Sequence, residues 1–432
     1  MEPFLARRRR LLEAIDGAAI FFAAPWALRT NDVRHEYRQD SDLFYLTGFR
    51  EPEAVLVLAP KHADHKQILF VRPRDPENAV WDGPRAGVEG AVERFGADIA
   101  HPIGELAARL PEYLRGHQRL YHALGKSRSA DDRVIEAIAR VRGKGRSASI
   151  WPTEIVDPAV VLHEMRARKS NDELFRMRRA AEITRDAHLA AMAAAAPGRH
   201  EYEVEAEIRR VCRQRGAERL AYPPIVGSGP NALVLHYRDN NRKIEDGELV
   251  LIDAAAEHDY YACDVTRTFP ANGAFSPAQR ELYEVVLEAE QAAIEAIKPG
   301  ATIDGIHAIA VRQVVAGLVR LGLLEGEVDA LVESRAYRKL YMHRTSHYLG
   351  MDVHDVGLYY GANGKPRPLE EGMVLTVEPG IYVAADDASA PARFRGLGVR
   401  IEDDVVVTAE GFRELTSDIP REAAEVERAC RA

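Results

Sequence analysis

The part of this 432-residue chain after residue 160 repeats one order of secondary structure, and no other feature constrains its fold as strongly. Helix-forming residues 171–196 and 201–216 are separated by Pro-Gly, and residues 278–297 and 302–322 are separated in the same way. Each helical pair then gives way to apolar runs that are typical of strands. We expect two helix-helix-hairpin units that pack with approximate twofold symmetry and bury both hairpins between the helices. A chance recurrence within an ordinary α/β chain is the alternative.

The residues before this repeat are organised differently. The apolar runs AIFFAAP, AVLVLAP and QILFV precede the amphipathic segment IGELAARLPEYLRG. This alternation predicts a mixed sheet flanked by helices. Residues 151–157 contain one proline and end just before another, which makes them the best candidate for a linker. Because the chain is too long for one ordinary core, we expect an α/β (α+β) protein of two domains, residues 1–160 and 161–432.

Composition argues against two classes of protein. Apolar residues make up 46% of the chain, yet no apolar stretch approaches the roughly 20 residues that span a bilayer. A formal net charge of −9 disfavours nucleic-acid binding, which usually requires a basic face. We therefore expect small or peptide substrates, with no nucleic acid and no membrane as partners. The basic run at residues 7–10 is flanked by acidic residues and predicts a solvated turn of an N-terminal helix, not a targeting segment.

Three cysteines, Cys212, Cys263 and Cys430, are widely spaced along the chain. An odd number with this spacing provides no disulfide framework, so a reducing cytoplasm is the expected location. Cys263 adjoins an acidic residue, which leaves a role as ligand or nucleophile open. A small buried thiol on a strand is the favoured interpretation.

Four carboxylates and one imidazole lie on the buried strands of the repeat and on one loop between them: Asp253, Asp264, His347, Glu378 and Glu402. Asp253 ends the apolar run LVLID, and Glu378 ends the run VLTVE before Pro-Gly turns the chain. A carboxylate buried alone on a strand would cost several kcal/mol or lose its charge. Cations remove that cost, so the five residues together predict a metal site.

The period of two in the surrounding strands supports this interpretation. In DVTRTF it places Asp264 and the two threonines on one face of a strand. In VRIEDD it places Arg400, Glu402 and Asp404 on one face. Oxygen-rich ligation with one imidazole suits Mn, Co or Zn better than Cu(I) or an iron-sulfur cluster. Two such ions can acidify a shared water into a hydroxide nucleophile, so hydrolysis of an amide or ester is the expected reaction.

Several motifs resemble those of a known group of enzymes. The segments VLIDAAAEHDYYACDVTRTFP, SHYLGMDVHDVG, VLTVEPGIY and GVRIEDDVVVT are similar to the proline peptidases of the pita-bread metallopeptidases, and within that group to the aminopeptidase P family. YRQDSDLFYLTGFREPEAVLVLAP, VVLHEMRARKS and IVGSGPNALVLHYRDN extend the resemblance over nearly the whole chain. It implies a creatinase-like N-terminal domain, a pita-bread catalytic domain with pseudo-twofold symmetry, and peptide substrates with proline at the second position.

The resemblance also implies roles for the five ligands. Asp253 and Asp264 would bind one metal, and His347 and Glu378 would complete the other together with Asp264. Glu402 would bridge both ions. A hydroxide between the metals would attack the carbonyl carbon before proline, and Glu378 would accept and pass on its proton. The family implies two divalent ions per subunit, Mn in first place, with Co or Zn as alternatives.

Further residues match positions that surround the metals in this family. His354 would stabilise the tetrahedral intermediate, and His236 and His343 would line the proline side. Arg400 would link the position of the first aspartate to a tyrosine, here Tyr382, and would orient that ligand.

Three more positions match the family's substrate pocket or depart from it. Tyr222 and Trp81 correspond to aromatic residues near the substrate, and in the family this tryptophan belongs to the N-terminal domain and can reach a neighbouring subunit's site. An ordinary core aromatic is the competing role for each. Arg344 stands where many members have a small residue, and its side chain would narrow or recharge the pocket.

The resemblance leaves the reaction open in two respects. Prolidase, which is restricted to Xaa-Pro dipeptides, shares all five ligands, but the sequence HRTSH at residues 343–347 differs from the HGLGH typical of prolidases and favours aminopeptidase P. Non-catalytic pita-bread binding modules form a remote alternative, because they have lost ligands that are present here. A homodimer or homotetramer is expected from the family.

Overall fold

The computed structural model describes residues 1–142 and 150–431, which form two compact units, Met1–Met165 and Arg166–Ala432. The boundary between the units lies within helix α7 (Ala159–Ala167). No helix of the described residues is both long and apolar enough to cross a membrane.

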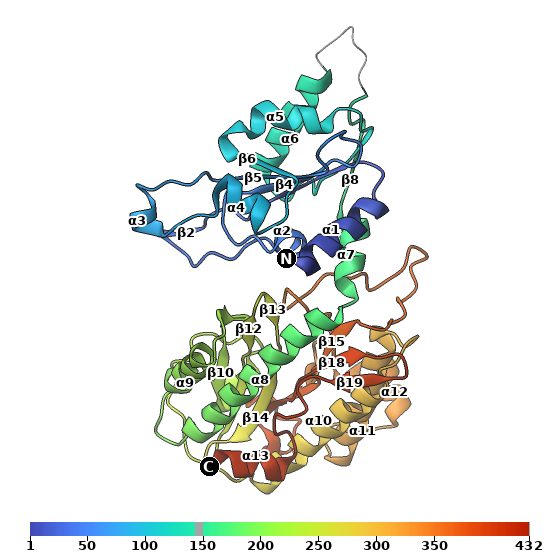
Figure 1. Cartoon of the computed structure of the whole chain (residues 1–432). Coiled ribbons are helices and arrows are strands. Elements are labelled where there is room, and N and C mark those ends of the chain that lie inside the picture. The colour runs from blue at the N-terminus through green and yellow to red at the C-terminus, as the bar shows by residue number, and fades with distance from the viewer. Residues whose placement is uncertain (143–149, 432) are drawn as a thin grey trace. The chain divides into compact units, whose positions relative to one another are not determined.

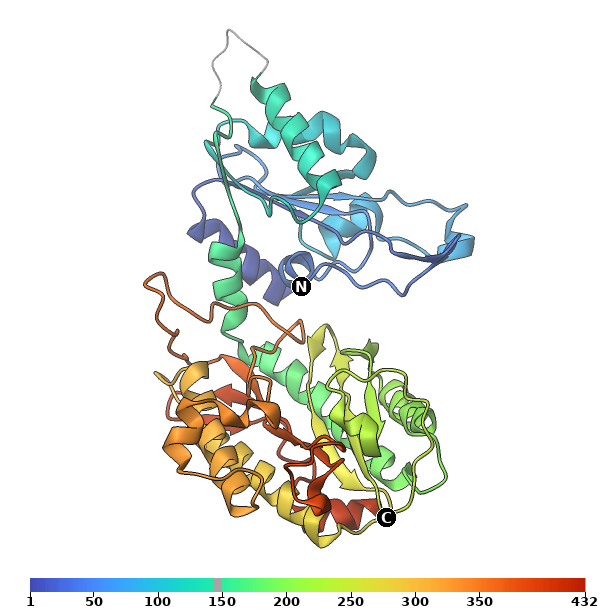
Figure 2. The same cartoon turned by 180° about the vertical axis from the view of Figure 1, so that it is seen from behind.

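Within residues 1–142 and 150–165, six strands form the expected mixed sheet in the order β6-β5-β4-β1-β7-β8. Its central strands are antiparallel and its outer pairs are parallel. Helices α5 and α6 cover one face, and α1 and α2 cover the other (Figures 1 and 2). The elements are α1 (Glu2–Ala14), β1 (Ala18–Phe22), β2 (Leu28–Thr30), β3 (Val33–Arg34), α2 (Ser41–Thr47), β4 (Val55–Leu58), β5 (Gln67–Val71), α3 (Ala79–Asp82), α4 (Gly87–Glu93), β6 (Ile99–Pro102), η1 (Ile103–Glu105), α5 (Leu106–Leu114), β7 (Arg119–Tyr121), α6 (Arg128–Arg142) and β8 (Glu154–Val156).

Two expectations for this unit are wrong. Residues 151–157 are not a linker, because β8 lies within them and pairs in parallel with β7, with Arg119 opposite Glu154. The basic run is helical but only partly solvated, since the Arg8 side chain is fully buried. Its guanidinium donates to the carbonyl oxygens of Leu46 (2.8 Å) and Phe95 (2.8 Å). Backbone acceptors distant in sequence therefore make burial of this cation favourable.

Residues 166–431 contain the two predicted copies of one plan. Helices α8 and α9 pack together and lead into the antiparallel sheet β10-β11-β14, and α10 and α11 lead into the antiparallel sheet β15-β18-β19. In Figures 1 and 2 these strands lie between α9 on one side and α10 and α11 on the other. The elements are α8 (Asn171–Ala194), α9 (Glu201–Gln214), β9 (Arg219–Leu220), β10 (Ile225–Ser228), η2 (Gly229–Leu233), β11 (Leu249–Asp253), β12 (Ala256–His258), β13 (Tyr261–Ala262), β14 (Thr266–Pro270), α10 (Pro277–Glu295), α11 (Ile303–Arg320), α12 (Val328–Glu333), η3 (Ala336–Lys339), β15 (Val374–Val377), β16 (Gly380–Tyr382), η4 (Ala392–Phe394), β17 (Gly398–Arg400), β18 (Asp403–Val407), β19 (Phe412–Glu414) and α13 (Ala423–Cys430).

The helices of the two copies begin with matching local signals. At the start of α8, the Ser170 backbone N–H donates to the Glu173 carboxylate at 3.0 Å. At the start of α10, the Ser276 N–H donates to Gln279 Oε1 at 2.9 Å, while Ser276 Oγ accepts from the Gln279 N–H at 3.3 Å. Such capping boxes satisfy N–H groups that a helix cannot bond internally. The sequence therefore fixes where each helical pair starts.

Three predicted carboxylate ligands do not lie on strands as expected, and one of them, Glu378, directly follows β15. Asp264 precedes β14, where the chain leaves the sheet β9-β12-β13 to join β10-β11-β14. Glu402 lies between β17 and β18, so VRIEDD is not one continuous strand. All three residues occupy a point where the chain changes sheets, and a strand break there lets a carboxylate point into a cavity.

Candidate active site

A pocket of about 920 Å³ in the C-terminal unit brings most of the predicted site residues together. Its walls come from strand ends, strand breaks and loops of both copies of the repeat. The predicted residues that line it are Tyr222, His236, Asp253, Asp264, His343, Arg344, His347, His354, Glu378, Arg400 and Glu402.

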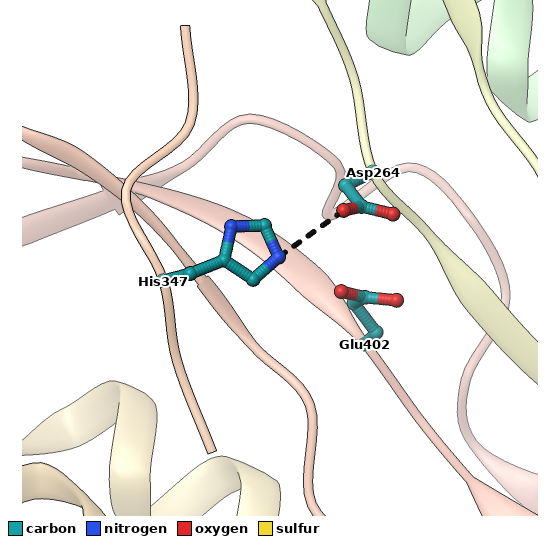
Figure 3. A group of neighbouring side chains, drawn as sticks. All are labelled: Asp264, His347 and Glu402. Carbon is teal, nitrogen blue, oxygen red and sulfur yellow. Dashed lines mark ion pairs between the residues drawn. The ribbon is translucent and has the colours of Figure 1, made fainter. Parts of the chain in front are cut away.

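Three of these side chains form a compact cluster. One ligand atom from each of Asp264, His347 and Glu402 lies within 4.8 Å of the other two. His347 Nε2 is 3.4 Å from Asp264 Oδ2. Figure 3 shows the imidazole pointing toward the Asp264 carboxylate, with the Glu402 carboxylate beside it. Asp264 comes from the first copy of the repeat and the other two residues from the second, so the cluster lies where the copies meet.

The orientation of His347 suits a metal ligand. Its Nδ1 is 3.0 Å from the Tyr348 carbonyl oxygen, and this contact requires Nδ1 to donate. The Nε2 atom is therefore left facing the carboxylates, and a backbone carbonyl on the other ring nitrogen is the usual partner of a metal-binding histidine. Burial lowers the pKa of His347, but Asp264 and Glu378 outweigh this effect and raise it to about 9.

Asp253 and Glu378 extend the cluster. Asp253 Oδ2 accepts a hydrogen bond from Arg400 Nη2 at 2.6 Å, whereas its buried Oδ1 accepts none from the described residues. Glu378 Oε1 is 3.7 Å from His347 Nε2. Burial raises the pKa of Asp253, raises that of Glu378 to about 7, and raises that of Glu402 well above its ordinary value, with neighbouring carboxylates adding to each rise.

These properties fit divalent cations. The donor set is four carboxylates and one imidazole, the set that hard and borderline divalent ions prefer. Carboxylates gathered in a buried site cannot all stay ionised unless positive charge compensates them. The orphaned Oδ1 of Asp253 points to the same conclusion, because a buried oxygen without a partner is costly.

Arg400 organises one wall of the site. Besides Asp253, its guanidinium donates to the Tyr382 hydroxyl (3.0 Å) and to Thr266 Oγ1 (3.1 Å). The Thr266 hydroxyl in turn donates to Glu402 Oε2 at 2.7 Å. One buried cation thus orients two candidate ligands, one directly and one through a threonine. Tyr382 lies behind the pocket, and only 3% of its surface is exposed.

The histidines around the cluster differ in environment. His343 Nδ1 donates to the Arg344 carbonyl oxygen at 2.8 Å, so its Nε2 accepts from the Tyr382 hydroxyl at 3.0 Å. Burial, together with Arg400, lowers the pKa of His343 to about 4, which keeps this imidazole neutral. The ring of His354 packs edge-on against His347 with centroids 4.5 Å apart.

The remaining predicted residues are placed as follows. The Tyr222 hydroxyl accepts from the Val265 N–H at 3.5 Å, and burial raises its pKa, as do the nearby carboxylates. His236 is exposed on the pocket wall. Arg344 donates to Asp304 Oδ1 at 2.9 Å. Trp81 lies on α3 in the N-terminal unit with 84% of its surface exposed, so it is not a core aromatic.

Sequence reasoning missed two supporting groups. Asp404 is buried behind the cluster, and one of its oxygens accepts the Asp264 backbone N–H at 3.0 Å. The alternation in VRIEDD, which groups Asp404 with Glu402, was the available signal in the sequence. Cys263 is also buried here, which agrees with a structural thiol, although it lies in the strand break before β14.

The second missed group is a buried ion cluster beside the histidines. The Asp355 carboxylate accepts from Lys169 Nζ at 3.0 Å and from Arg166 Nη2 at 2.7 Å. The Asp355 N–H donates to the carbonyl oxygen of Tyr348, the same atom that accepts from His347. The cluster therefore ties the loop that carries His347 and His354 to the start of the unit. The segment VVLHEMRARKS contains Arg166 and Lys169, but nothing in its sequence indicates that Asp355 is the residue they bind.

Comparison with known proteins gives consistent matches over the whole chain. Residues 176–409 match metallopeptidase family M24, and residues 4–121 match the N-terminal domain of aminopeptidase P. The chain is 44% identical to Xaa-Pro aminopeptidase of Escherichia coli, covering 99% of this chain and 97% of that protein. It is 36% identical to human Xaa-Pro aminopeptidase 3, covering 99% and 85%.

Solved structures agree with these matches. Aminopeptidase PepP of Pseudomonas aeruginosa superposes with a TM-score of 0.98 at 49% identity, covering all of this chain and 98% of that one. A substrate complex of an Escherichia coli aminopeptidase P variant gives a TM-score of 0.96 at 44% identity, with the same coverage. The expected fold class, an aminopeptidase P N-terminal domain followed by a pita-bread domain, is confirmed.

Proposed function

This chain belongs to metallopeptidase family M24, and we propose that it is an Xaa-Pro aminopeptidase, which hydrolyses the bond between the first residue of a peptide and a proline at the second position. The names of its relatives support this activity over that of a prolidase. The observation that carries the proposal is the convergence of Asp264, His347 and Glu402 in a pocket that also contains Asp253 and Glu378.

We propose two divalent ions per subunit, manganese in first place and cobalt or zinc as alternatives. Asp253 and Asp264 would hold one ion, His347 and Glu378 would hold the other with Asp264, and Glu402 would contact both. When bound, such a pair supplies an acidified water as nucleophile and polarises the scissile carbonyl. The oxygen-rich donor set and the uncompensated Asp253 oxygen support this assignment.

Glu378 is the proposed proton carrier. Its carboxyl lies partly buried in the pocket, and desolvation raises its pKa to about 7 against the opposing charges of His347 and Arg400. That value describes the site without ions, and a bound cation would lower it. A carboxylate beside the attacking water can accept its proton and release it to the leaving nitrogen. Arg400 is proposed as a positioning residue, because its guanidinium donates hydrogen bonds to Asp253, Tyr382 and the threonine beside them.

The histidines are proposed to handle the substrate. His354 would donate a hydrogen bond to the oxyanion of the tetrahedral intermediate. His343, held neutral and fixed by Tyr382, would line the proline side together with His236. A proline imide nitrogen has no N–H, and its ring fixes φ. General peptidases that bind this N–H therefore reject peptides with proline at the second position, whereas a site that does not use the N–H can accept them. Tyr222 is proposed as part of the same wall.

Assembly and location are proposed from the family. We propose a homodimer or homotetramer in the cytoplasm, with residues 1–160 as the domain that mediates assembly and residues 161–432 as the catalytic domain. The high exposure of Trp81 supports a role for it at a subunit contact. Light scattering coupled to size-exclusion chromatography would measure the number of subunits.

A matched set of peptides tests the activity. Release of the first residue would be measured from Arg-Pro-Pro, Arg-Pro and Arg-Ala-Ala with manganese supplied. Cleavage of Arg-Pro-Pro but not Arg-Ala-Ala is the expected result. Cleavage confined to the dipeptide would identify a prolidase, and no cleavage of any peptide would favour a non-catalytic binding module.

A further inference from the structure

A second pocket adjoins the candidate active site, and its lining is basic. Its volume is about 250 Å³, and three arginines, Arg335, Arg338 and Arg344, line it together with His307 and His343. None of the described residues that line it is acidic. His343 and Arg344 line the larger pocket as well, so the two pockets share a wall.

The positive charge of this basic pocket is only partly compensated. Arg344 is paired with Asp304 through a hydrogen bond of 2.9 Å. Within residues 166–431, neither Arg335 nor Arg338 forms an ion pair, although both lie in or next to the short helix η3. Arg335 has a φ of 59°, a left-handed conformation that non-glycine residues seldom adopt. The tight turn that this conformation makes sets both arginines on the pocket wall.

The side chains that line the two pockets define a polarity for a bound peptide. The carboxylate cluster around Asp264 and Glu402 offers oxygens that would accept hydrogen bonds from the free α-amine of a substrate. A peptide anchored there by its amine directs the part beyond the scissile bond away from the cluster. Arginine is the side chain best suited to receive a carboxylate at the other end, because its planar fork can donate two parallel hydrogen bonds.

We propose that the basic pocket is an anion subsite, and that Arg335 and Arg338 bind a carboxylate of the peptide beyond the proline. This inference rests on the proposed aminopeptidase activity and adds a substrate class to it, namely short peptides with a free carboxyl group near the cleaved bond. A volume of about 250 Å³ is below the range of a complete small-molecule site and suits one terminal residue or one acidic side chain.

Four peptides separate the two sources of the carboxylate. Arg-Pro-Pro and its C-terminal amide differ only in the terminal charge, whereas Arg-Pro-Asp amide and Arg-Pro-Asn amide differ only in the side-chain charge. The kcat and KM of manganese-loaded enzyme would be measured for each, in the wild type and in the double variant Arg335→Gln, Arg338→Gln. The matched control is Arg312→Gln, which removes an exposed arginine of α11 that pairs with Asp329.

The wild type is expected to favour the charged peptide of at least one pair by about tenfold in kcat/KM, mainly through KM, as for one charge-assisted contact. That ratio should fall to about one in the double variant and persist in the Arg312→Gln control. A preference within the first pair assigns the subsite to the terminal carboxylate, and a preference within the second pair assigns it to an acidic side chain.

Two results would overturn the subsite without touching the proposed activity. In one, the wild type cleaves all four peptides equally well, which leaves the aminopeptidase proposal standing. In the other, a charge preference survives in the double variant, which places the anion site elsewhere. If the wild type cleaves none of the four peptides, the proposed activity itself is wrong and the subsite falls with it. Far-UV circular dichroism would establish that the double variant is folded.

Discussion

Replacing Lys169 by methionine should destabilise the C-terminal unit far more than the same replacement of its neighbour Arg168. Both cations are ion-paired, Lys169 with Asp355 at 3.0 Å and Arg168 with Glu370 at 2.6 Å. They differ in burial: the first pair has side-chain exposures of 1% and 1%, whereas the second has 37% and 44%. The comparison therefore sets a buried ion pair against a largely exposed one.

The expected magnitudes follow from that difference. Removing one partner of a buried ion pair typically costs 3–5 kcal/mol, because the other charge remains desolvated. Asp355 keeps the Arg166 guanidinium at 2.7 Å, so we expect the lower end, about 3 kcal/mol. An exposed pair contributes about 0–1 kcal/mol, which is the limit expected for Arg168→Met. A loss of about 3 kcal/mol would lower the melting temperature of a unit of this size by about 6–12 °C.

Chemical unfolding followed by far-UV circular dichroism would measure both free energies, with the denaturant midpoint as the quantity compared. If Lys169→Met and Arg168→Met lower the free energy of unfolding equally, the buried ion pair does not contribute the expected amount of about 3 kcal/mol to stability. A lower kcat in Lys169→Met, with the fold retained at low temperature, would further connect the cluster to the His347–His354 loop.

This difference should also depend on pH. Burial alone would raise the pKa of Asp355, but Lys169 and Arg166 overcome it and hold the pKa below the ordinary value. A carboxyl whose pKa is lower in the folded state stabilises the protein above its unfolded pKa of about 3.9 and loses that contribution as the pH falls through the folded pKa. The gap between wild type and Lys169→Met should therefore be constant from about pH 6 to 8 and shrink below about pH 4. A gap that grows on acidification would refute the assignment.

Four further outcomes are expected. Asp264→Ala should abolish turnover while circular dichroism still reports a folded chain, and its metal content, measured by mass spectrometry, should fall; near wild-type turnover would refute the two-metal site. A chelator should inactivate the wild type and lower its melting temperature, and added manganese should restore both, because ligands that bind only the folded state stabilise it. Arg400→Lys should weaken metal affinity by about 10–100-fold, measured by titration, because lysine cannot hold Asp253 and the tyrosine together; unchanged affinity would contradict the positioning role. Gly350→Ala should lower the melting temperature of the unit, since a Cβ there would lie 2.1 Å from Asp355 Oδ2. An unchanged melting temperature would show that Asp355 can move away without cost.

The sequence predicted best those helix ends and strands that depend on residues close to one another in the chain. The Pro-Gly breaks and the capping residues Ser170 and Ser276 lie at the predicted helix boundaries, and the helices begin and end within a few residues of them. The apolar runs of the N-terminal unit became β1, β4 and β5 for the same reason. The candidate ligands were recognisable because buried carboxylates are unusual at the ends of apolar runs.

The features that were missed depend on contacts between distant residues. Lys169 and Asp355 are separated by 186 positions, and nothing near either residue indicates the other. Arg8 is buried because carbonyl groups of Leu46 and Phe95 converge on it, and a helical periodicity cannot reveal those acceptors. Strand β8 has three residues, too few for an alternation, and its hydrogen bonds to a neighbouring strand define it.

The division of the candidate ligands between the two copies of the repeat has a mechanical consequence. Asp253 and Asp264 belong to the first copy, and His347, Glu378 and Glu402 belong to the second. A shear of about 1 Å between the copies would leave every strand paired within its own sheet and yet pull the ligand atoms out of reach of a shared ion. Metal binding therefore depends on how the two copies pack against each other, in addition to the pairing of strands within each copy.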